Sequence, residues 1–381
     1  MHVEFNSSPT SSLGVEIEVG LIDTTSRELT CIASEVLAIV GRDHPEGEHP
    51  KAKHELYEST IEVITGICAN AGEARTDLQA TVDELRAVIE PRGVAFEGAG
   101  LHPFSRWFDL VQTPGERYAE LVDRIQWPAR RLMTHGVHFH VGVRSGEKSI
   151  AIMNALTHYL PHFVALSASS PFWHGHDSGM ASVRTKIFEA MPTAGLPPQL
   201  DSWSDFEHFL ATLIRAGSIK TVREVWWDIR PHPDFGTVEL RMCDGIPTLS
   251  EVASIAAMAQ CLVDRMDQNL DAGRSLPNPR EWIRRENKWR AARDGIDAEI
   301  VIDDEGSVQP IQESIRELLD ELASTAQKLN CREELDGVRA ILEHGPSYKR
   351  QRAVVAAGGS LVDVVDLLRD EMLTDTPGGG R

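Results

Sequence analysis

Three segments of the chain alternate strictly between aliphatic and other side chains, which predicts β-strands. The first covers residues 13–22 and reads LGVEIEVGLI, the second covers 136–143 and reads GVHFHVGV, and the third lies around 236–243. Because successive residues of a strand point to opposite sides, each segment has one aliphatic face and one face of reactive side chains. Further strands are predicted at 94–100 and around 222–229.

Apolar residues at helical spacing fill much of the remaining chain. Asn70 opens one helix, with Glu73 three residues later as a capping box and Pro91 as the stop. A long loop at 168–203 is rich in Gly, Pro and Ser, and 299–308 is predicted as a short hairpin or a loop. The other predicted helices cover 115–133, 149–167, 204–215, 249–270, 280–293, 310–329, 332–343 and 359–372.

The order of these elements indicates the fold class. Strands with interspersed helices come first, and the part from about residue 249 is helical, which favours an α+β fold with an antiparallel sheet. A chain of 381 residues can form one large domain. We therefore expect a single domain over 13–370, with an N-terminal extension at 1–12 and a flexible tail at 371–381.

Charge and composition exclude several classes of function. The chain has 38 Lys and Arg against 58 Asp and Glu, a net charge of −20, which argues against a broad nucleic-acid surface and against anionic membranes. A small anionic ligand is still compatible, because a metal ion or an Arg can invert the local potential. The most apolar stretch, 252–263, is too short to span a bilayer, and the N-terminus lacks the features of a signal peptide. Five scattered cysteines without a CxxC pair indicate reduced thiols, so we expect a cytoplasmic protein.

The reactive faces of the three alternating strands carry side chains that ligate metals or bind anions. They are Glu16, Glu18, His138, His140, Glu239 and Arg241. If the strands pair in one antiparallel sheet, these side chains converge on a single surface. The alternative is a solvated outer sheet face, but such faces normally draw on Lys, Thr, Ser and Gln. Carboxylates with an imidazole suit Mg²⁺ or Mn²⁺ better than a metal that prefers thiolates.

Four further residues are weaker candidates. Glu55 and Glu62 lie in the stretch HELYESTIEVIT, seven residues apart, so they converge only if the chain bends between them; otherwise they are exposed carboxylates. Glu97, in AFEGAG, is interpreted as a solvated strand position. Arg230 follows WWDI at a strand end and either pairs with Asp228 or binds a carboxylate or phosphate.

The sequence has no glycine-rich signature of nucleotide binding. The chain has no P-loop, and GAGLHP at 98–103 does not fit a GxGxxG pattern. A second HxH pair, His174 and His176, lies in the long loop and is interpreted as loop contacts rather than metal ligands.

An ordered set of motifs covers nearly the whole chain. In sequence they read GVEIEVGLID, ELYESTIEVIT, GVHFHVGV, SASSPFWHGHDSG, WWDIRPHPDFGTVELRMCD and ENKWRAARDG. Over about residues 13–370, this set resembles the carboxylate-amine ligases of the glutamate–cysteine ligase type 2 (YbdK-like) family.

The resemblance implies a fold and a reaction. The expected fold is that of glutamine synthetase, in which a curved antiparallel sheet lines a funnel with helices outside. ATP would enter one end and the amino-acid substrate the other, with Mg²⁺ or Mn²⁺ between them. ATP would convert a carboxylate to an acyl phosphate, and an amine would then displace phosphate to form an amide. Glutamate and cysteine would give γ-glutamylcysteine, and a homo-oligomer, dimer or larger, is expected.

The resemblance also implies roles for individual residues. His140 would contact the substrate carboxylate or the transferred phosphoryl group. Arg241 would stabilise that phosphoryl group, with Arg230 as a second cation near the nucleotide. Arg184, in the long loop, would hold a substrate carboxylate, or it is an ordinary surface Arg. The implied metal ligands are Glu16, Glu18, Glu55, Glu62, His138 and Glu239.

Two other functions are compatible with the same residues. One is a metal-dependent hydrolase in which His138, His140 and carboxylates activate a zinc-bound water. The other is a protein that binds a nucleotide without catalysis.

Overall fold

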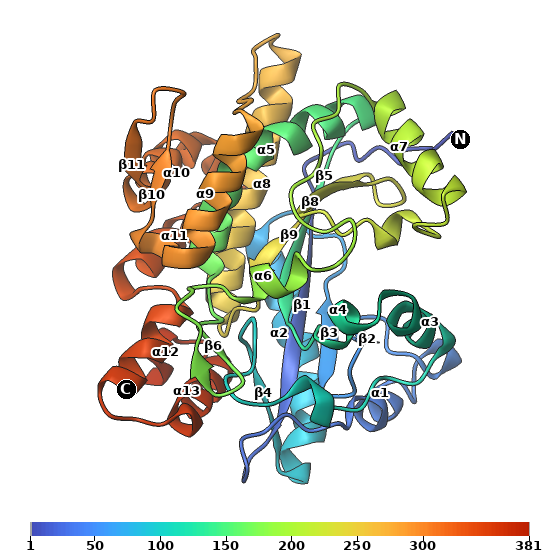
Figure 1. Ribbon diagram of the computed structural model, residues 1–381, viewed down its shortest axis with the longest axis vertical. Helices are drawn as coiled ribbons and strands as arrows, with labels where there is room; N and C mark the ends of the chain where they lie inside the picture. Colours follow the sequence, from blue (N-terminus) through green and yellow to red (C-terminus); the bar gives the residue numbers. More distant parts are fainter. Residues whose placement is uncertain (1, 381) are drawn as a thin grey trace.

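One antiparallel sheet of seven strands organises the computed structural model, which describes residues 2–380 (Figure 1). The strands follow the order β2-β3-β1-β5-β9-β8, and β4 pairs with the end of β1. Gly20 of β1 is in register with Thr60 on one side and with Glu97 on the other, so β3 and β4 lie on opposite edges of β1. The strands are β1 (Leu13–Asp23), β2 (Ala52–His54), β3 (Thr60–Ile64), β4 (Val94–Glu97), β5 (Gly136–Gly142), β8 (Ile229–His232) and β9 (Thr237–Asp244).

Two small hairpins lie outside this sheet. One pairs β6 (Phe172–Trp173) with β7 (His176–Asp177), and the other pairs β10 (Glu299–Val301) with β11 (Val308–Pro310). The second begins in the stretch 299–308, which was predicted as a short hairpin or a loop, and ends two residues beyond it.

Helices surround the sheet, and most of those after β9 pack on one another. The helices are α1 (Ala33–Val40), α2 (Ala71–Ile89), α3 (Glu116–Ile125), α4 (Trp127–Arg130), α5 (Gly146–Ser167), α6 (Arg184–Phe188), α7 (Trp203–Arg215), α8 (Leu249–Asp271), α9 (Glu281–Asp294), α10 (Ile311–Lys328), α11 (Arg332–His344), α12 (Ser347–Ala356) and α13 (Leu361–Thr374). In residues 2–380, no helix combines the length and the apolar character needed to cross a membrane.

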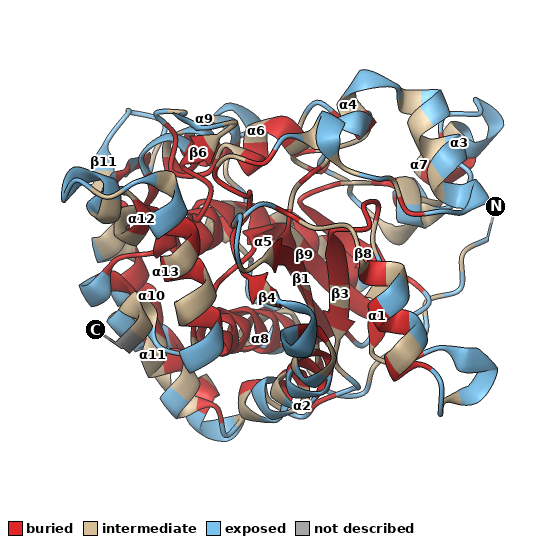
Figure 2. Ribbon diagram, turned by 90° about the horizontal axis from the view of Figure 1, so that it is seen from below, coloured by how far each residue is buried: buried red, intermediate tan, exposed pale blue. Residues whose placement is uncertain are grey.

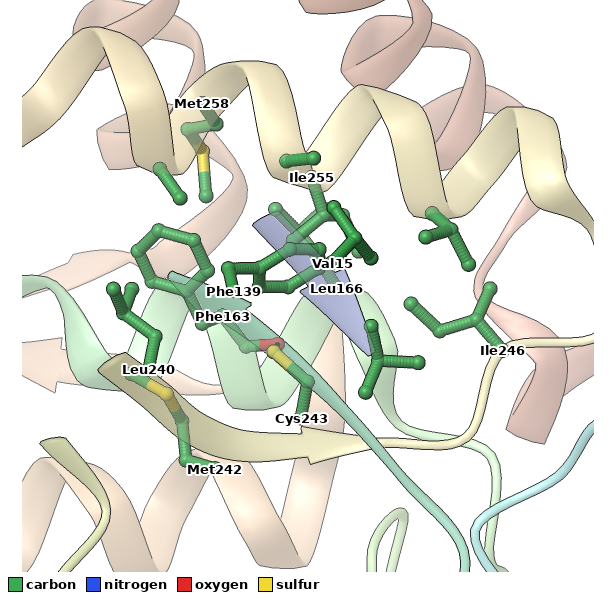
Figure 3. Close-up of a cluster of buried hydrophobic side chains, with 14 of the residues drawn as sticks. Val15, Phe139, Phe163, Leu166, Leu240, Met242, Cys243, Ile246, Ile255 and Met258 are labelled. Atoms are coloured by element: carbon green, nitrogen blue, oxygen red, sulfur yellow. Dashed lines mark hydrogen bonds between the residues drawn. The ribbon is translucent and has the colours of Figure 1, made fainter. Parts of the chain in front are cut away.

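The aliphatic face of the sheet forms the core together with α2, α5 and α8. Val15, Phe139 and Leu240, from three neighbouring strands, are almost completely buried. Figure 3 shows them against Ile255 and Met258 of α8. Burial of this face fixes the register of the strands, because a shift of one residue would turn every aliphatic side chain of a strand away from the helices.

The N-terminal cap of α2 involves the two residues of the predicted capping box, but one of its two hydrogen bonds has a different donor. The side chain of Asn70 accepts a hydrogen bond from the backbone N–H of Glu73 at 3.0 Å. The carboxylate of Glu73 accepts its bond from the N–H of Ala69 at 2.7 Å. The first bond satisfies an N–H group that the first turn of a helix leaves free, and the second satisfies the N–H group of the residue before the N-cap.

Two predicted elements differ in extent. The strand around 222–229 is displaced, because the Arg230 guanidinium donates to the carbonyls of Val222, Arg223 and Val225 and these residues form a turn. The strand begins only at Ile229. The helix over 115–133 is interrupted between α3 and α4, where Gln126 has a φ of 62°.

The tail predicted from residue 371 is shorter than expected. Helix α13 continues to Thr374, and Glu371 is fully buried. Its carboxylate accepts a hydrogen bond from Arg350, at 2.6 Å from Nε. The apolar spacing ends near Met372, so the sequence pattern gave no sign of this polar anchor.

Candidate active site

The reactive face of the sheet lines a cavity of about 770 Å³. This face is not solvated, because the structure buries or half-buries its charged side chains (Figure 2). The predicted site residues that line the cavity are Glu16, Glu18, Glu55, Glu62, His138, His140, Arg230, Glu239 and Arg241.

Strand register places these side chains next to one another. Glu16 of β1 is opposite His138 of β5, and Glu18 is opposite Glu62 of β3. His140 of β5 is opposite Glu239 of β9. Directly opposed residues lie about 4.5–5.5 Å apart on the same face, so the alternation and the register together create one cluster. Glu55 reaches the cluster from the bend between β2 and β3, which is the bend that its convergence with Glu62 requires.

Two groups of three side chains on this face have the arrangement of cation ligands. One consists of Glu16, Glu62 and His138, and the other of Glu16, His140 and Glu239. Within each group the ligand atoms lie within 4.8 Å of one another.

Glu16 belongs to both groups. Its Oε2 lies 3.1 Å from Nδ1 of His138, and its Oε1 lies 3.2 Å from Nε2 of His140. His140, which was expected to contact the substrate carboxylate or the transferred phosphoryl group, therefore lies in a group of side chains that could hold a cation. Glu18 and Glu55 lie outside both groups, and the Oε2 of Glu18 accepts the N–H of Gly136 at 2.5 Å.

The surroundings shift the pKa values of the carboxyl groups in the cluster in opposite directions. Burial and the neighbouring carboxylates raise the pKa of Glu62 well above its usual value, and burial with the charge of Glu18 raises the pKa of Glu55 to about 8. Burial alone would also raise the pKa of Glu16, but its contacts with His140 and His138 hold it well below the usual value. The β3 side of the cluster thus carries crowded carboxyl groups without enough positive charge.

Two arginines neutralise the opposite side of the cluster. Nε of Arg230 lies 2.6 Å from Oε2 of Glu239, and Nη1 of Arg241 contacts Oε1 of the same carboxylate. These two charges outweigh the effect of burial and hold the pKa of Glu239 well below its usual value. Arg230 therefore pairs with Glu239 rather than with Asp228, which instead accepts a hydrogen bond from Lys288 at 2.6 Å.

Arg184 is placed differently from the other predicted site residues. It is buried but does not line the cavity, and its Nη1 lies 4.0 Å from the carboxylate of Asp244. A Cβ at Gly136 would lie 2.2 Å from Nη2 of Arg184, so the guanidinium packs closely on the start of β5. Arg184 is thus neither a surface residue nor part of the cavity wall.

The interpretation of Glu97 as a solvated position is wrong. Glu97 is fully buried, its Oε1 lies 3.4 Å from Nδ1 of His135, and neither carboxylate oxygen has a hydrogen-bond partner among residues 2–380. His135 comes from the loop before β5, and its Nε2 is hydrogen-bonded to the hydroxyl of Thr60 in β3 at 3.1 Å. The alternation within β4 could not reveal this partner, because the partner comes from another part of the chain.

Gly20 leaves the space that this buried pair occupies, so Gly20→Ala is expected to lower the free energy of unfolding by about 1–3 kcal/mol. A Cβ there would lie 2.6 Å from Oε1 of Glu97 and 2.9 Å from Cε1 of His135. Urea denaturation measures the change. Gly14→Ala on the same strand is the control, because its Cβ would make only an ordinary 3.5 Å contact with His140. Equal losses in the two variants would contradict this packing argument.

Several cavity residues had no sequence signal. Phe235 is 54% exposed and stacks on His232, with ring centroids 4.1 Å apart. Arg117 and Tyr118 line the cavity from α3, an amphipathic helix whose apolar spacing predicts the helix but does not indicate a cavity at its first turn. The register that brings His232 to the cavity follows from its pairing with Thr237, which the displaced strand prediction missed.

Two solved structures share this fold. One is a glutamate–cysteine ligase from Francisella tularensis in complex with AMP, with a TM-score of 0.69 and 12% sequence identity, covering 98% of this chain and 90% of that one. The other is a bifunctional glutathione synthetase from Pasteurella multocida, with a TM-score of 0.65 and 15% identity, covering 96% of this chain and 52% of that one. The predicted fold class is confirmed.

Sequence comparison shows nearer relatives. A protein of Frankia alni named "Putative glutamate--cysteine ligase 2-1" is 54% identical over 99% of both chains. A protein of Thermobifida fusca named "Putative glutamate--cysteine ligase 2" is 50% identical over all of this chain and 95% of its own length. The model of glutamate–cysteine ligase family 2 matches residues 12–366, which agrees with the extent of the resemblance read from the motifs. The chain belongs to glutamate–cysteine ligase family 2.

Proposed function

We propose that the protein is an ATP-dependent carboxylate-amine ligase that forms an amide through an acyl phosphate, with glutamate and cysteine as first candidate substrates. The observation that carries this proposal is the shared position of Glu16 in two groups of cation ligands beside Arg230 and Arg241. One cavity thereby combines oxygen ligands for cations with two fixed guanidinium groups. The Francisella tularensis ligase with the same fold binds AMP, which supports a nucleotide as one substrate.

The chemistry requires such a combination. A carboxylate resists attack by an amine because its carbonyl carbon is electron-rich. Transfer of the γ-phosphoryl group of ATP to a carboxylate oxygen creates a leaving group, and the amine then forms the C–N bond as phosphate departs with that oxygen. Positive groups must stabilise the charge on the transferred phosphoryl oxygens. In this proposal Arg241 and Arg230 stabilise that charge, since both guanidinium groups are already held at the cavity by Glu239.

The donor set fits a divalent cation that prefers oxygen. Each group offers two carboxylates and one imidazole, and Nε2 of His140 is buried without a hydrogen bond in the described part of the chain. Mg²⁺ or Mn²⁺ is therefore the ion we propose. A divalent cation at these residues would neutralise charge on the phosphate oxygens of ATP. The residues that would hold it are Glu16, Glu62, His138, His140 and Glu239.

The two other candidate functions gain no comparable support. A zinc hydrolase usually binds its metal through several imidazoles or thiolates, whereas each group here has two carboxylates and one imidazole. A binding protein without catalysis would not need both arginines of the cluster fixed on Glu239.

A screen for ADP release over pairs of carboxylates and amines is expected to find turnover that requires both ATP and Mg²⁺. Mass spectrometry of the product should show an amide whose mass equals the two substrates minus water. ADP release by ATP alone would indicate an ATPase instead of a ligase. Absence of ADP release with every pair, together with no binding of ATP, would refute the proposal.

A further inference from the structure

Some basic side chains of the cavity form no ion pair with an acidic group among residues 2–380. Of the Lys and Arg residues that line it, Arg230 and Arg241 are paired with Glu239. Lys53, Arg117 and Arg223 also line the cavity, and among residues 2–380 their side chains make no ion pair or hydrogen bond. An unpaired cation in an acidic cavity is available for an anionic group of a ligand.

Arg117 lies in a helix that is held against the cavity on two sides. On one side, the Tyr118 hydroxyl donates to the carbonyl of His54 at the end of β2, at 2.9 Å. On the other, Arg124 pairs with Glu224 at 2.6 Å, in the turn that precedes β8. Tyr118 and Val122 are also half-buried against an apolar cluster that includes Leu56, so polar contacts and apolar packing place the helix together. They put the first turn of α3, which carries Arg117, in the cavity wall.

The cavity has two chemically different sides. Arg230 and Arg241 act on Glu239, on the strands β8 and β9 at one edge of the sheet. Arg117 acts instead on Glu55, next to β2 at the other edge, where its charge opposes the rise in the pKa of that carboxyl. A substrate whose reacting carboxylate lies at the central cluster could therefore reach Arg117 with a second carboxylate on the β2 side.

We propose that Arg117 binds the carboxylate of the amino-acid substrate that is not phosphorylated, and so selects α-amino acids with a second carboxylate over simple carboxylic acids. This inference rests on the proposed ligase function. The planar guanidinium of Arg can hold a carboxylate through two parallel hydrogen bonds, which fixes the orientation of the substrate as well as its affinity.

The other two unpaired cations fit this role less well. Lys53 is opposite Glu62 in the pairing of β2 with β3, so its ammonium group shares a face with a carboxyl of the cluster. Arg223 belongs to the turn whose carbonyls bind Arg230, on the side of the cavity assigned to the phosphoryl group.

Steady-state ADP release by full-length wild type, Arg117→Ala and Arg117→Lys tests the assignment, with L-glutamate, L-cysteine, ATP and Mg²⁺ as the probe. Arg117→Ala is expected to raise KM for L-glutamate about 10- to 100-fold, with kcat and KM for ATP within about 2-fold of wild type. Arg117→Lys should recover part of the loss. Glu116→Ala, an exposed neighbour on the same helix, is the control for the helix itself and should match wild type.

A substrate that lacks the second carboxylate makes the test specific. With 4-aminobutyrate in place of L-glutamate, wild type and Arg117→Ala should have the same, poor kcat/KM. An unchanged KM for L-glutamate in Arg117→Ala, or an equal loss with 4-aminobutyrate, would overturn the inference while ADP release still supports a ligase. The same holds if Lys53→Ala raises KM for L-glutamate and Arg117→Ala does not.

If wild type releases no ADP with these substrates, calorimetry decides the role of Arg117 independently of turnover. L-Glutamate is titrated into each protein with Mg²⁺ and a non-hydrolysable ATP analogue. Binding that is at least about 10-fold weaker in Arg117→Ala supports the assignment. Equal binding by the two proteins, or no binding by wild type, overturns it.

Discussion

Glu16→Gln is expected to lower the rate of ADP release by about 1000-fold or more. Glu16 is the one side chain common to both groups of cation ligands, and its two oxygens face His138 and His140 separately. Glutamine has nearly the same size, but it has no negative charge and only one acceptor oxygen. The variant therefore weakens both groups together, and a 1000-fold loss corresponds to about 4 kcal/mol of transition-state stabilisation.

Stability and a second variant separate this loss from misfolding. Glu16 adds to the repulsion that raises the pKa of Glu62, but its contacts with His138 and His140 hold its own pKa well below the usual value, so its neutral replacement should make the metal-free protein somewhat less stable without unfolding it, which urea denaturation measures. Glu18→Gln is the comparison, because Glu18 faces the same cavity but lies outside both groups. We expect a smaller loss of activity for it. If Glu16→Gln kept more than about a tenth of wild-type activity, neither group could be the catalytic metal site.

The faces of the strands could be predicted from the sequence, but their register could not. Alternation assigns Glu16 and His138 to reactive faces, whereas their direct opposition depends on how β1 and β5 align. That alignment is set by the apolar contacts with α5 and α8, which involve residues far apart in the chain. For the same reason the sequence did not reveal that His140 pairs with Glu239.

Residues whose role depends on a distant partner were the ones misplaced or missed. Glu97 is an ordinary strand carboxylate by its local pattern, and only His135 accounts for its burial. Arg184 was taken from the family resemblance, yet its guanidinium lies 4.0 Å from the carboxylate of Asp244 and does not line the cavity. Arg117 is exposed on α3, and the helical spacing of Tyr118 and Val122 indicates the packed side of that helix but not the cavity beside its first turn.

Mg²⁺ is expected to raise the melting temperature by about 6 °C relative to protein in EDTA. Without cations, the β3 side of the cluster holds Glu18, Glu55 and Glu62 close together, and their repulsion appears in the raised pKa values of Glu55 and Glu62. Ions that bind only the folded state stabilise it by about 2.7 kcal/mol per site at 100 times Kd, or about 5 kcal/mol for two sites. A chain of this length has an unfolding entropy of about 0.8 kcal/mol/K, so that gain corresponds to about 6 °C.

Calorimetric melting curves in EDTA and in excess Mg²⁺, at matched ionic strength, measure this shift. Potassium chloride alone should reproduce little of it, because salt screening acts weakly on half-buried charges. In Glu16→Gln the shift should fall by more than half, since that variant weakens both sites and already relieves part of the repulsion. Identical curves for wild type in EDTA and Mg²⁺ would show that the cluster binds no cation, and the acidic cavity would then need another partner to balance its charge.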